Sequence, residues 1–240
     1  MGVLKPVRSV SLKDRAVGAI RDAIFSGQLA PGDPLRELHL AKELQVSQPT
    51  VREALMELER SCLVVRKANI ETTVANMTTT EIRDRIELRV LLEKAAMRKA
   101  VQRLTPADYN TLEDQLATLS KAVASGDYHE VAQTDLSFHS LLWERSGNMA
   151  LLHGLECLTT PLFAFVSIMR NAWADDLSGV VAQHREIIEE LRAGDLDALD
   201  ETITEHVSTT YQPFLQSSAA DFRSYIQNQR TYQSRRSSAS

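Results

Sequence analysis

The feature that most constrains the fold is the long segment from residue 78 onward, in which apolar residues recur at helical spacing and no strand pattern appears. Thr-Pro pairs are typical of helix starts, and glycines are typical of helix ends. The breaks in the pattern fall at Thr105-Pro106, Gly126-Asp127, Gly147-Asn148 and Gly194-Asp195. This spacing predicts about six helices of roughly 15 to 25 residues with short connections, which is typical of an antiparallel bundle.

The first third of the chain has a different pattern, with three short helices followed by two short strands. An amphipathic repeat begins at Leu12 and ends before Gly27, and a second, shorter one follows the turn LAPGDPL. Ser47 is suited to cap a third helix, and Pro49 is tolerated in its first turn. The β-branched runs CLVVRK and ETTVAN then have the spacing of a small hairpin. The predicted fold is therefore mainly α, with one small hairpin ahead of the bundle.

Charge supports a division of the chain into three parts. Residues 1–76 carry a net charge of +2, residues 77–216 carry −10, and residues 217–240 carry +3. A polyanion would be repelled by the middle part, so any contact with nucleic acid is expected in the first. We therefore predict an N-terminal domain over 1–76, a helical domain over 77–216, and a polar tail rich in Ser, Gln and Arg over 217–240.

Composition excludes several other classes of protein. With 43% apolar and 25% charged residues, the chain has the composition of a soluble globular protein, and its apolar runs look too short to cross a bilayer. The start of the chain lacks the apolar core of a secretory signal, so a cytoplasmic location without a membrane partner is expected. Cys62 and Cys157 lie far apart in sequence, so we expect two buried small hydrophobic residues rather than a disulfide or a zinc site.

The third predicted helix has the chemistry of a DNA reader. A short capped helix that follows another helix and a tight turn is typical of a helix-turn-helix, whose second helix presents its first residues to the major groove. Arginine pairs with guanine and glutamine with adenine, whereas threonine contacts a phosphate or a thymine methyl. Arg36 and the hairpin residues would lie near the DNA backbone. The candidate DNA-binding residues are Arg36, Ser47, Gln48, Thr50, Arg52, Lys67 and Asn69. Alternatively, Arg52 and its neighbours form only a solvated helix face, and the pattern alone does not decide.

The run LRELHLAKELQVSQPTVREALMELERSCLV resembles the winged helix-turn-helix of GntR-type bacterial transcriptional regulators. That family reads L-x-E-x-x-L-A, then V-S-R-T-P-V-R-E-A-L-x-x-L, then a glycine before L-V. The resemblance implies that Arg36 and Arg52 contact DNA, with Ser47 and Thr50 beside phosphates. Gln48 replaces the usual arginine, which implies an altered operator preference. The sequence Asn69-Ile70-Glu71 replaces the usual N-R-G wing tip, which should weaken a minor-groove contact.

Four polar residues in the helical part fall on faces that should be apolar. Asp135 and His139 lie four residues apart on one apolar stripe, while His184 and His206 each lie within the stripe of a later helix. A lone buried histidine is usually a hydrogen-bonded core residue, but three histidines with an aspartate need mutual compensation or a metal ion. Three nitrogen ligands and one oxygen ligand suit zinc, nickel or manganese. We therefore predict one divalent metal ion, with zinc as the first candidate.

The order D-x-x-F-H, x-x-L, S-G-N, H-x-x-I and a final histidine is similar to the FCD effector domain found behind GntR-type readers. The resemblance implies metal ligands at Asp135, His139, His184 and His206, and small organic acids that bind near the metal and alter DNA affinity. Arg89, in the run ELRVLLEKAA, is the first candidate to hold such an acid, and Arg170 is the second. Otherwise these arginines form salt bridges at helix surfaces, for example with Glu93.

These features favour a ligand-responsive regulator over an enzyme. We expect a homodimer that binds a near-palindromic double-stranded operator, in which an acid at the metal shifts the helices nearest the linker at residues 76–80. One alternative is a metal-dependent hydrolase. It would need a general base, but Glu186 projects away from His184 and no H-E-x-x-H segment occurs. The other alternative is a regulator whose metal ion is purely structural.

Overall fold

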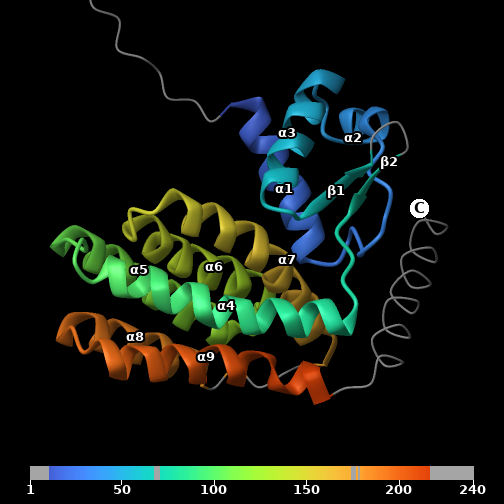
Figure 1. Ribbon diagram of the computed structural model, residues 1–240. Coiled ribbons are helices and arrows are strands. Elements are labelled where there is room, and N and C mark those ends of the chain that lie inside the picture. The colour runs from blue at the N-terminus through green and yellow to red at the C-terminus, as the bar shows by residue number, and fades with distance from the viewer. Residues whose placement is uncertain (1–10, 68–70, 174–176, 178, 217–240) are drawn as a thin grey trace, which may run out of the picture.

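The computed structural model describes residues 11–67, 71–173, 177 and 179–216, and over these residues the chain is mainly helical (Figure 1). The N-terminal part, which we call the head, contains three helices and a hairpin. Its elements are α1 (Leu12–Phe25), α2 (Glu37–Glu43), α3 (Gln48–Arg60), β1 (Val64–Lys67) and β2 (Glu71–Val74). The two strands pair antiparallel in the register Val64↔Val74 to Lys67↔Glu71. The predicted helix order and hairpin are confirmed.

The C-terminal part, which we call the bundle, holds six helices among the described residues, as predicted. They are α4 (Thr79–Ala100), α5 (Pro106–Ser125), α6 (Tyr128–Arg145), α7 (Met149–Trp173), α8 (Val180–Ala193) and α9 (Leu196–Gln216). Helix α6 packs against α4, α5 and α7, while α8 and α9 pair with each other and close the bundle against α5 and α4 (Figure 1). The predicted tail over 217–240 lies outside the described residues.

Local sequence signals explain where these helices begin. The Ser47 hydroxyl accepts a hydrogen bond from the Thr50 amide at the start of α3. Thr78 with Glu81, and Thr105 with Asp108, form reciprocal capping boxes at α4 and α5. Each box satisfies two amides that the first helical turn leaves without partners. The helix starts are therefore encoded by residues within one turn of each boundary.

Helix α7 is the apolar centre of the protein. The segment Met149–Arg170 has a mean hydropathy of 1.5 and is long and apolar enough to cross a membrane, so the expectation of only short apolar runs is wrong. Half of this segment is buried inside the protein. Pro161 lies inside the continuous helix and, because it lacks an amide proton, leaves the carbonyl of Cys157 without its helical hydrogen bond. The guanidinium of Arg85 in α4 donates to the carbonyls of Cys157 and Leu158, 3.1 and 2.9 Å away, and so compensates for the missing bond.

The expectation for the two cysteines is also wrong. Cys62 and Cys157 are both partly exposed, and a disulfide bond joins them. The spacing of the two cysteines in the sequence does not indicate this pairing, because they meet only when the fold places the end of α3 against α7. The backbone of Cys62 has a φ of 55°, in the left-handed region. A side chain in this region costs about 1 kcal/mol or more, and glycine is usual there.

The head lies directly on the bundle. One continuous apolar cluster contains Ile24 and Phe25 of α1, Leu55 of α3, Trp143 of α6 and Phe163 of α7. The Ser167 hydroxyl donates to the Phe25 carbonyl at 2.9 Å, which adds a polar contact between α7 and the end of α1. The position of the head is therefore set by α6, α7 and the disulfide.

Candidate metal centre and nucleic-acid interface

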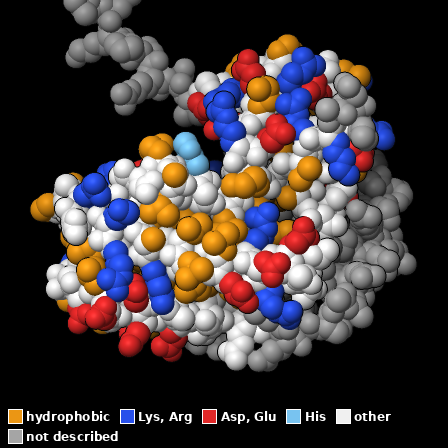
Figure 2. All heavy atoms as spheres, viewed as in Figure 1, with side chains coloured by type: hydrophobic (Ala, Val, Ile, Leu, Met, Phe, Trp, Pro, Cys, Tyr) orange, Lys and Arg blue, Asp and Glu red, His pale blue; other side chains and the backbone are white. Residues whose placement is uncertain are grey.

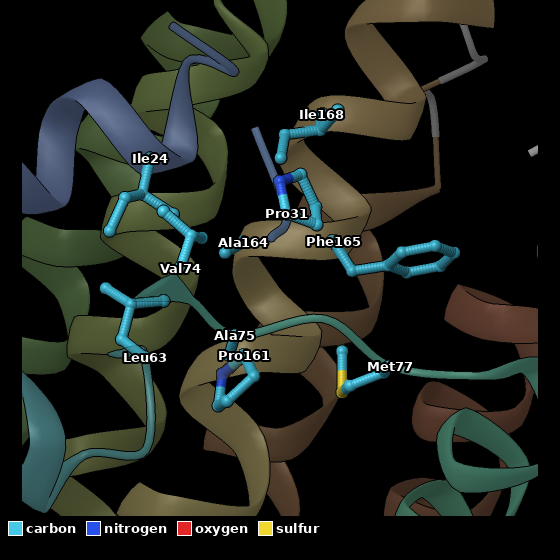
Figure 3. Close-up of a pocket in the computed structure, with 10 residues that line it drawn as sticks. All are labelled: Ile24, Pro31, Leu63, Val74, Ala75, Met77, Pro161, Ala164, Phe165 and Ile168. Atoms are coloured by element: carbon cyan, nitrogen blue, oxygen red, sulfur yellow. The ribbon is translucent and has the colours of Figure 1, made fainter. Parts of the chain in front are cut away.

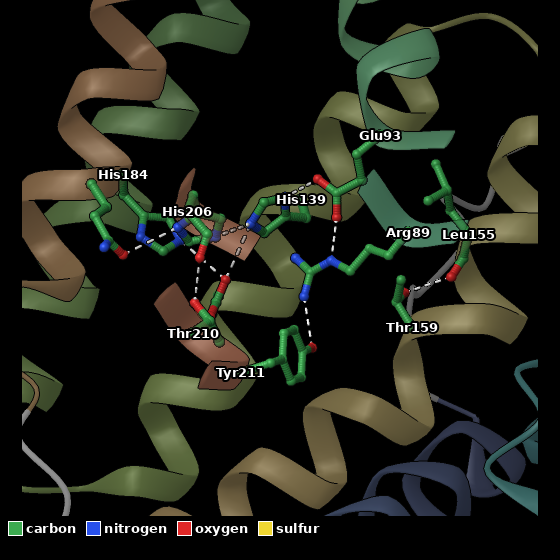
Figure 4. A network of polar contacts seen from close by, with 11 residues as sticks. Arg89, Glu93, His139, Leu155, Thr159, His184, His206, Thr210 and Tyr211 are labelled. Carbon is green, nitrogen blue, oxygen red and sulfur yellow. Dashed lines mark hydrogen bonds and ion pairs between the residues drawn. The ribbon is translucent and has the colours of Figure 1, made fainter. Parts of the chain in front are cut away.

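Four buried side chains converge in the centre of the bundle. Asp135 and His139 come from successive turns of α6, His184 comes from α8, and His206 comes from α9. None is more than 5% exposed, and their four ligand atoms lie within 4.8 Å of one another. Figure 4 shows the three imidazoles facing a common centre. The structure thus brings together the four residues that the sequence singled out.

Each imidazole has an oxygen atom close to its outer nitrogen, Nδ1. His139 Nδ1 lies 2.8 Å from a carboxylate oxygen of Glu93, and His184 Nδ1 lies 2.8 Å from the Val180 carbonyl. His206 Nδ1 lies 3.3 Å from the side-chain oxygen of Gln183. With a proton on each Nδ1, all three Nε2 lone pairs point inward. Metal-binding histidines in proteins are oriented in the same way.

The separations between the inner atoms suit one metal ion. Ligands about 2.1 Å from an ion lie about 3.0 to 3.4 Å apart when they occupy neighbouring coordination positions. His184 Nε2 and Asp135 Oδ1 are 3.0 Å apart, His139 Nε2 and His206 Nε2 are 3.1 Å apart, and His139 Nε2 is 3.4 Å from Asp135 Oδ1. Three nitrogens and one carboxylate oxygen therefore fit a divalent first-row ion.

The charges of the cluster are mutually compensated. Burial alone would raise the pKa of Asp135, but His184 and His139 hold it well below its usual value. Burial alone would lower the pKa of His139, yet the charge of Glu93 and the hydrogen bond to Asp135 raise it. Burial and the two neighbouring histidines lower the pKa of His206 well below its usual value, so this imidazole stays neutral. A neutral imidazole is the form that binds metal.

A second buried network continues from the cluster toward α7. Arg89 Nε donates to Glu93 at 2.6 Å, and Arg89 Nη1 donates to the Tyr211 hydroxyl at 2.7 Å (Figure 4). Burial would raise the pKa of Glu93, but Arg89 and His139 hold it at about 2. The Arg89 guanidinium also stacks 4.7 Å from the ring centroid of Phe163. The salt bridge with Glu93 exists, but it is buried rather than at a helix surface.

The two candidate arginines for an effector have different surroundings. Arg89 is 1% exposed, and its Nη2 has no hydrogen-bond partner among the described residues. Arg170 is 6% exposed and lies in the last turn of the described part of α7. Arg89 is joined to the candidate metal ligands through the Glu93 carboxylate, which also faces His139.

The start of α3 forms the candidate nucleic-acid interface. Glu37, in the first turn of α2, accepts from Arg52 Nε and Nη2 at 3.0 and 2.7 Å and from Gln48 Nε2 at 3.1 Å. The hydrogen bond from Arg52 is the main reason that the pKa of Glu37 is lowered. This carboxylate holds both base-reading candidates side by side on an exposed helix start. It also leaves Arg52 Nη1 available to an incoming acceptor.

The other predicted DNA contacts lie around this point. Arg36 is exposed at the N-cap of α2, and Ser47 is exposed at the N-cap of α3, where its hydroxyl also contacts that of Thr50 at 2.8 Å. Lys67 is exposed at the end of β1, on the turn side of the hairpin, where it pairs with Glu71. Asn69 lies outside the described residues, so its predicted wing contact stays a prediction.

Comparison with known families agrees with both parts of this architecture. Residues 12–74 match the profile of the bacterial regulatory proteins of the gntR family, and residues 84–209 match the FCD domain. The chain belongs to the gntR family of regulators and carries an FCD domain. Residues 12–74 cover the head from α1 to β2, and residues 84–209 include all four members of the Asp/His cluster.

Relatives of this GntR regulator have the same kind of function. It is 26% identical over 191 residues to the transcriptional repressor RspR of Escherichia coli, covering 78% of this chain and 82% of that protein. It is 26% identical over 186 residues to a probable D-xylose utilization operon repressor of Paenarthrobacter nicotinovorans, covering 77% and 80%. The solved structure of E. coli McbR/YncC superposes with a TM-score of 0.71 at 23% identity, covering 86% of this chain and all of the other. The GntR regulator is thus a DNA-binding protein that controls transcription.

Some site residues of the GntR regulator could not be found from its sequence. Glu93 was recognised only as a partner for Arg89, although it also orients His139 from a different helix. Tyr211 and Gln183 were not singled out, because a tyrosine or glutamine within a helical repeat has no distinctive spacing. The role of Glu37 as a shared acceptor depends on the angle between α2 and α3. Only the i,i+4 spacing of Arg89 and Glu93 was a usable signal.

The buried Arg89–Glu93 pair yields a stability prediction. Glu93→Gln keeps the side-chain shape but leaves a buried guanidinium without its counter-charge, which should lower the free energy of unfolding by about 3 to 5 kcal/mol. Urea unfolding in the presence of a chelator measures this without any contribution from metal. Glu87→Gln, at an exposed position of the same helix, is the matched control. A loss below about 1 kcal/mol would show that the pair is not a structural requirement.

Proposed function

We propose that this protein is a dimeric, cytoplasmic transcriptional regulator that binds one divalent metal ion and senses a small organic acid beside it. The metal ligands would be Asp135, His139, His184 and His206, with zinc as the first candidate and nickel or manganese as alternatives. The observation that carries the proposal is the convergence of three Nε2 atoms and one carboxylate oxygen, with an acceptor behind each imidazole. A metal ion bound there would offer a coordination position to a carboxylate oxygen of the acid.

Arg89 is the best candidate to hold the other end of an acid. Its charge is buried, and its Nη2 has no hydrogen-bond partner among the described residues. The carboxylate of Glu93 contacts both Arg89 and His139, and so links the arginine to the cluster. A second carboxylate that reached Nη2 would gain a charge-assisted hydrogen bond without further desolvation of the arginine. Arg170, also buried in the bundle, is the second candidate.

The same geometry argues against hydrolysis. Glu186 is exposed on α8, whereas His184 on the same helix is fully buried, so Glu186 does not face the cluster. Glu93 does face it, but Arg89 and His139 hold its pKa at about 2, which makes it a poor base. Together with the functions of its relatives, this favours a sensor over an enzyme.

An exposed apolar stripe on α4 supports the dimer. Leu88 and Leu91 are 44% and 65% exposed, lie three residues apart, and are followed by Ala95 on the same helix face. Hydrophobic side chains gather over this helix in the space-filling view (Figure 2). A second copy that packed on this stripe would produce a twofold dimer. Two heads related by that axis would bind a near-palindromic operator, with half-sites about one helical turn or a multiple apart.

The recognition helix makes a direct prediction. Arg52→Ala should weaken binding to a selected operator by about 1 to 3 kcal/mol, because a guanidinium paired with a guanine edge is lost. Fluorescence anisotropy at fixed salt measures this change. Arg60→Ala removes the same charge from the far end of the same helix, at an exposed residue paired with Glu57, and is the control. Equal losses in both variants would contradict the assignment of Arg52 to base reading.

Removal of two ligands tests the metal centre. The double variant His139→Ala, His184→Ala should lose its metal, because a single histidine and a carboxylate bind far more weakly than four converging ligands. Elemental analysis of the purified protein measures its metal content. His153→Ala, at an exposed position of α7, should keep its metal. Full metal occupancy in the double variant would refute the site.

Sensing is tested by a screen of organic acids. An acid that binds the metal-loaded protein should raise its stability by about 2.7 kcal/mol at about 100 times its Kd, and should change operator affinity. Both effects should disappear after chelation. A metal that raises thermal stability, combined with no acid that alters stability or operator binding, would instead favour the purely structural alternative.

A further inference from the structure

The disulfide between Cys62 and Cys157 is the only covalent link between head and bundle, besides the chain itself, in the part that the structure describes. Its two residues are 95 positions apart in sequence. Cys62 lies just after the last turn of α3, the helix that reads DNA, and Cys157 lies within α7. The bond therefore connects the far end of the reading helix to the centre of the effector domain.

The backbone at Cys62 is suited to a different residue. Its φ of 55° lies in the left-handed region, which glycine adopts freely and which is strained for a residue with a side chain. Neither sulfur is part of the metal centre or of the candidate DNA surface. Cys62 thus occupies a conformationally unfavourable position, and there its sulfur is bonded to Cys157 across the junction.

A small apolar pocket lies near the bond, at the junction of head and bundle. It is lined by Leu63 and Val74 of the head on one side and by Pro161 and Phe165 of α7 on the other (Figure 3). Leu63 follows Cys62 directly, and Pro161 is one turn from Cys157. Without the disulfide, the remaining polar contacts of the head include Ser167 with Phe25 and Gln133 with Asp22. A head held only by these contacts and by apolar packing lacks the covalent restraint beside the pocket.

We propose that Cys62 and Cys157 form a reversible thiol–disulfide switch, so that the protein responds to redox state as well as to its effector. The inference rests on the proposed function, because a regulator in the cytoplasm works where disulfides are uncommon and those present are usually redox-sensing or catalytic. Both residues are partly exposed, as access by a small thiol or disulfide requires.

The chemistry balances with a low-molecular-weight disulfide such as oxidised glutathione. One protein thiolate attacks a sulfur of that disulfide, forms a mixed disulfide and releases one small thiolate. The second protein thiolate then attacks the protein sulfur of the mixed disulfide and releases the other small thiolate. The two thiol protons end on the two released thiols, and the two electrons lost by the cysteines reduce the small disulfide. Excess small thiol reverses both steps.

The disulfide form should bind operator more tightly. It fixes the head on α7, so less conformational freedom is lost when two heads bind adjacent half-sites. Reduction releases the end of α3 and lets the head move at the pocket. We expect the Kd for DNA to rise at least tenfold on reduction.

The test uses full-length protein and a duplex that the wild-type protein selects from a random-sequence pool under both redox conditions. Anisotropy titrations in glutathione buffers from oxidising to reducing give the Kd, and thiol counting in the same buffers gives the redox state. The rate of amide hydrogen exchange in α1 and β1, measured without DNA, shows how strongly the disulfide restrains the head. We expect the weakening of DNA binding and the faster exchange to follow the appearance of two free thiols.

Cys62→Gly is the matched variant, because glycine relieves the backbone at this position while it removes the thiol. Cys157→Ser is the second variant. Both should bind the duplex with the Kd of the reduced wild type, and neither should respond to the glutathione ratio. A disulfide that resists reduction in the folded protein, or equal or tighter binding by the reduced form, overturns the switch. If neither form binds any duplex, the proposed function fails. If hydrogen exchange in α1 and β1 is unchanged on reduction, the disulfide does not restrain the head, and the switch is overturned on that ground alone.

Discussion

A carboxylate buried in a helical bundle must be compensated locally, and this requirement organises the interior of the protein. Asp135 and Glu93 are 5% and 0% exposed, and neither could remain ionised there alone. His139 contacts both carboxylates, His184 contacts Asp135, and Arg89 contacts Glu93. Because these groups come from α4, α6 and α8, the electrostatic requirement fixes three helices relative to one another.

The compensation also defines what the cluster can bind. In the protein without metal, the two carboxylates raise the pKa of His139, so a proton supplies part of the missing positive charge. A divalent ion would supply more charge at the same centre, and it would release that proton. His206 stays neutral among its positive neighbours and keeps a lone pair directed inward. The same residues are therefore stable as a hydrogen-bonded core and suited to a metal.

Much of this could be predicted from the sequence because it depends on local pattern. The capping boxes at Thr78 and Thr105, and the four polar residues on apolar stripes, are visible within a few residues of chain. The geometry behind the ligands was not visible, because Glu93 meets His139 across 46 positions and through the packing of two helices. The disulfide was missed for the same reason, since cysteine spacing says nothing about which helices cross.

The arrangement gives α7 a position that no other helix of the described bundle shares. It carries none of the four metal-ligand candidates, yet Phe163 lies under the Arg89 guanidinium, and Cys157, on the same helix, is bonded to the end of α3. An acid that drew Arg89 toward the metal would change the packing on Phe163, and α7 would pass that change to the head. With the disulfide formed, part of this path is covalent; with it reduced, the path depends on apolar packing beside a pocket. Effector and redox state would therefore both act on the contact between α7 and the head, and the response to one should depend on the other.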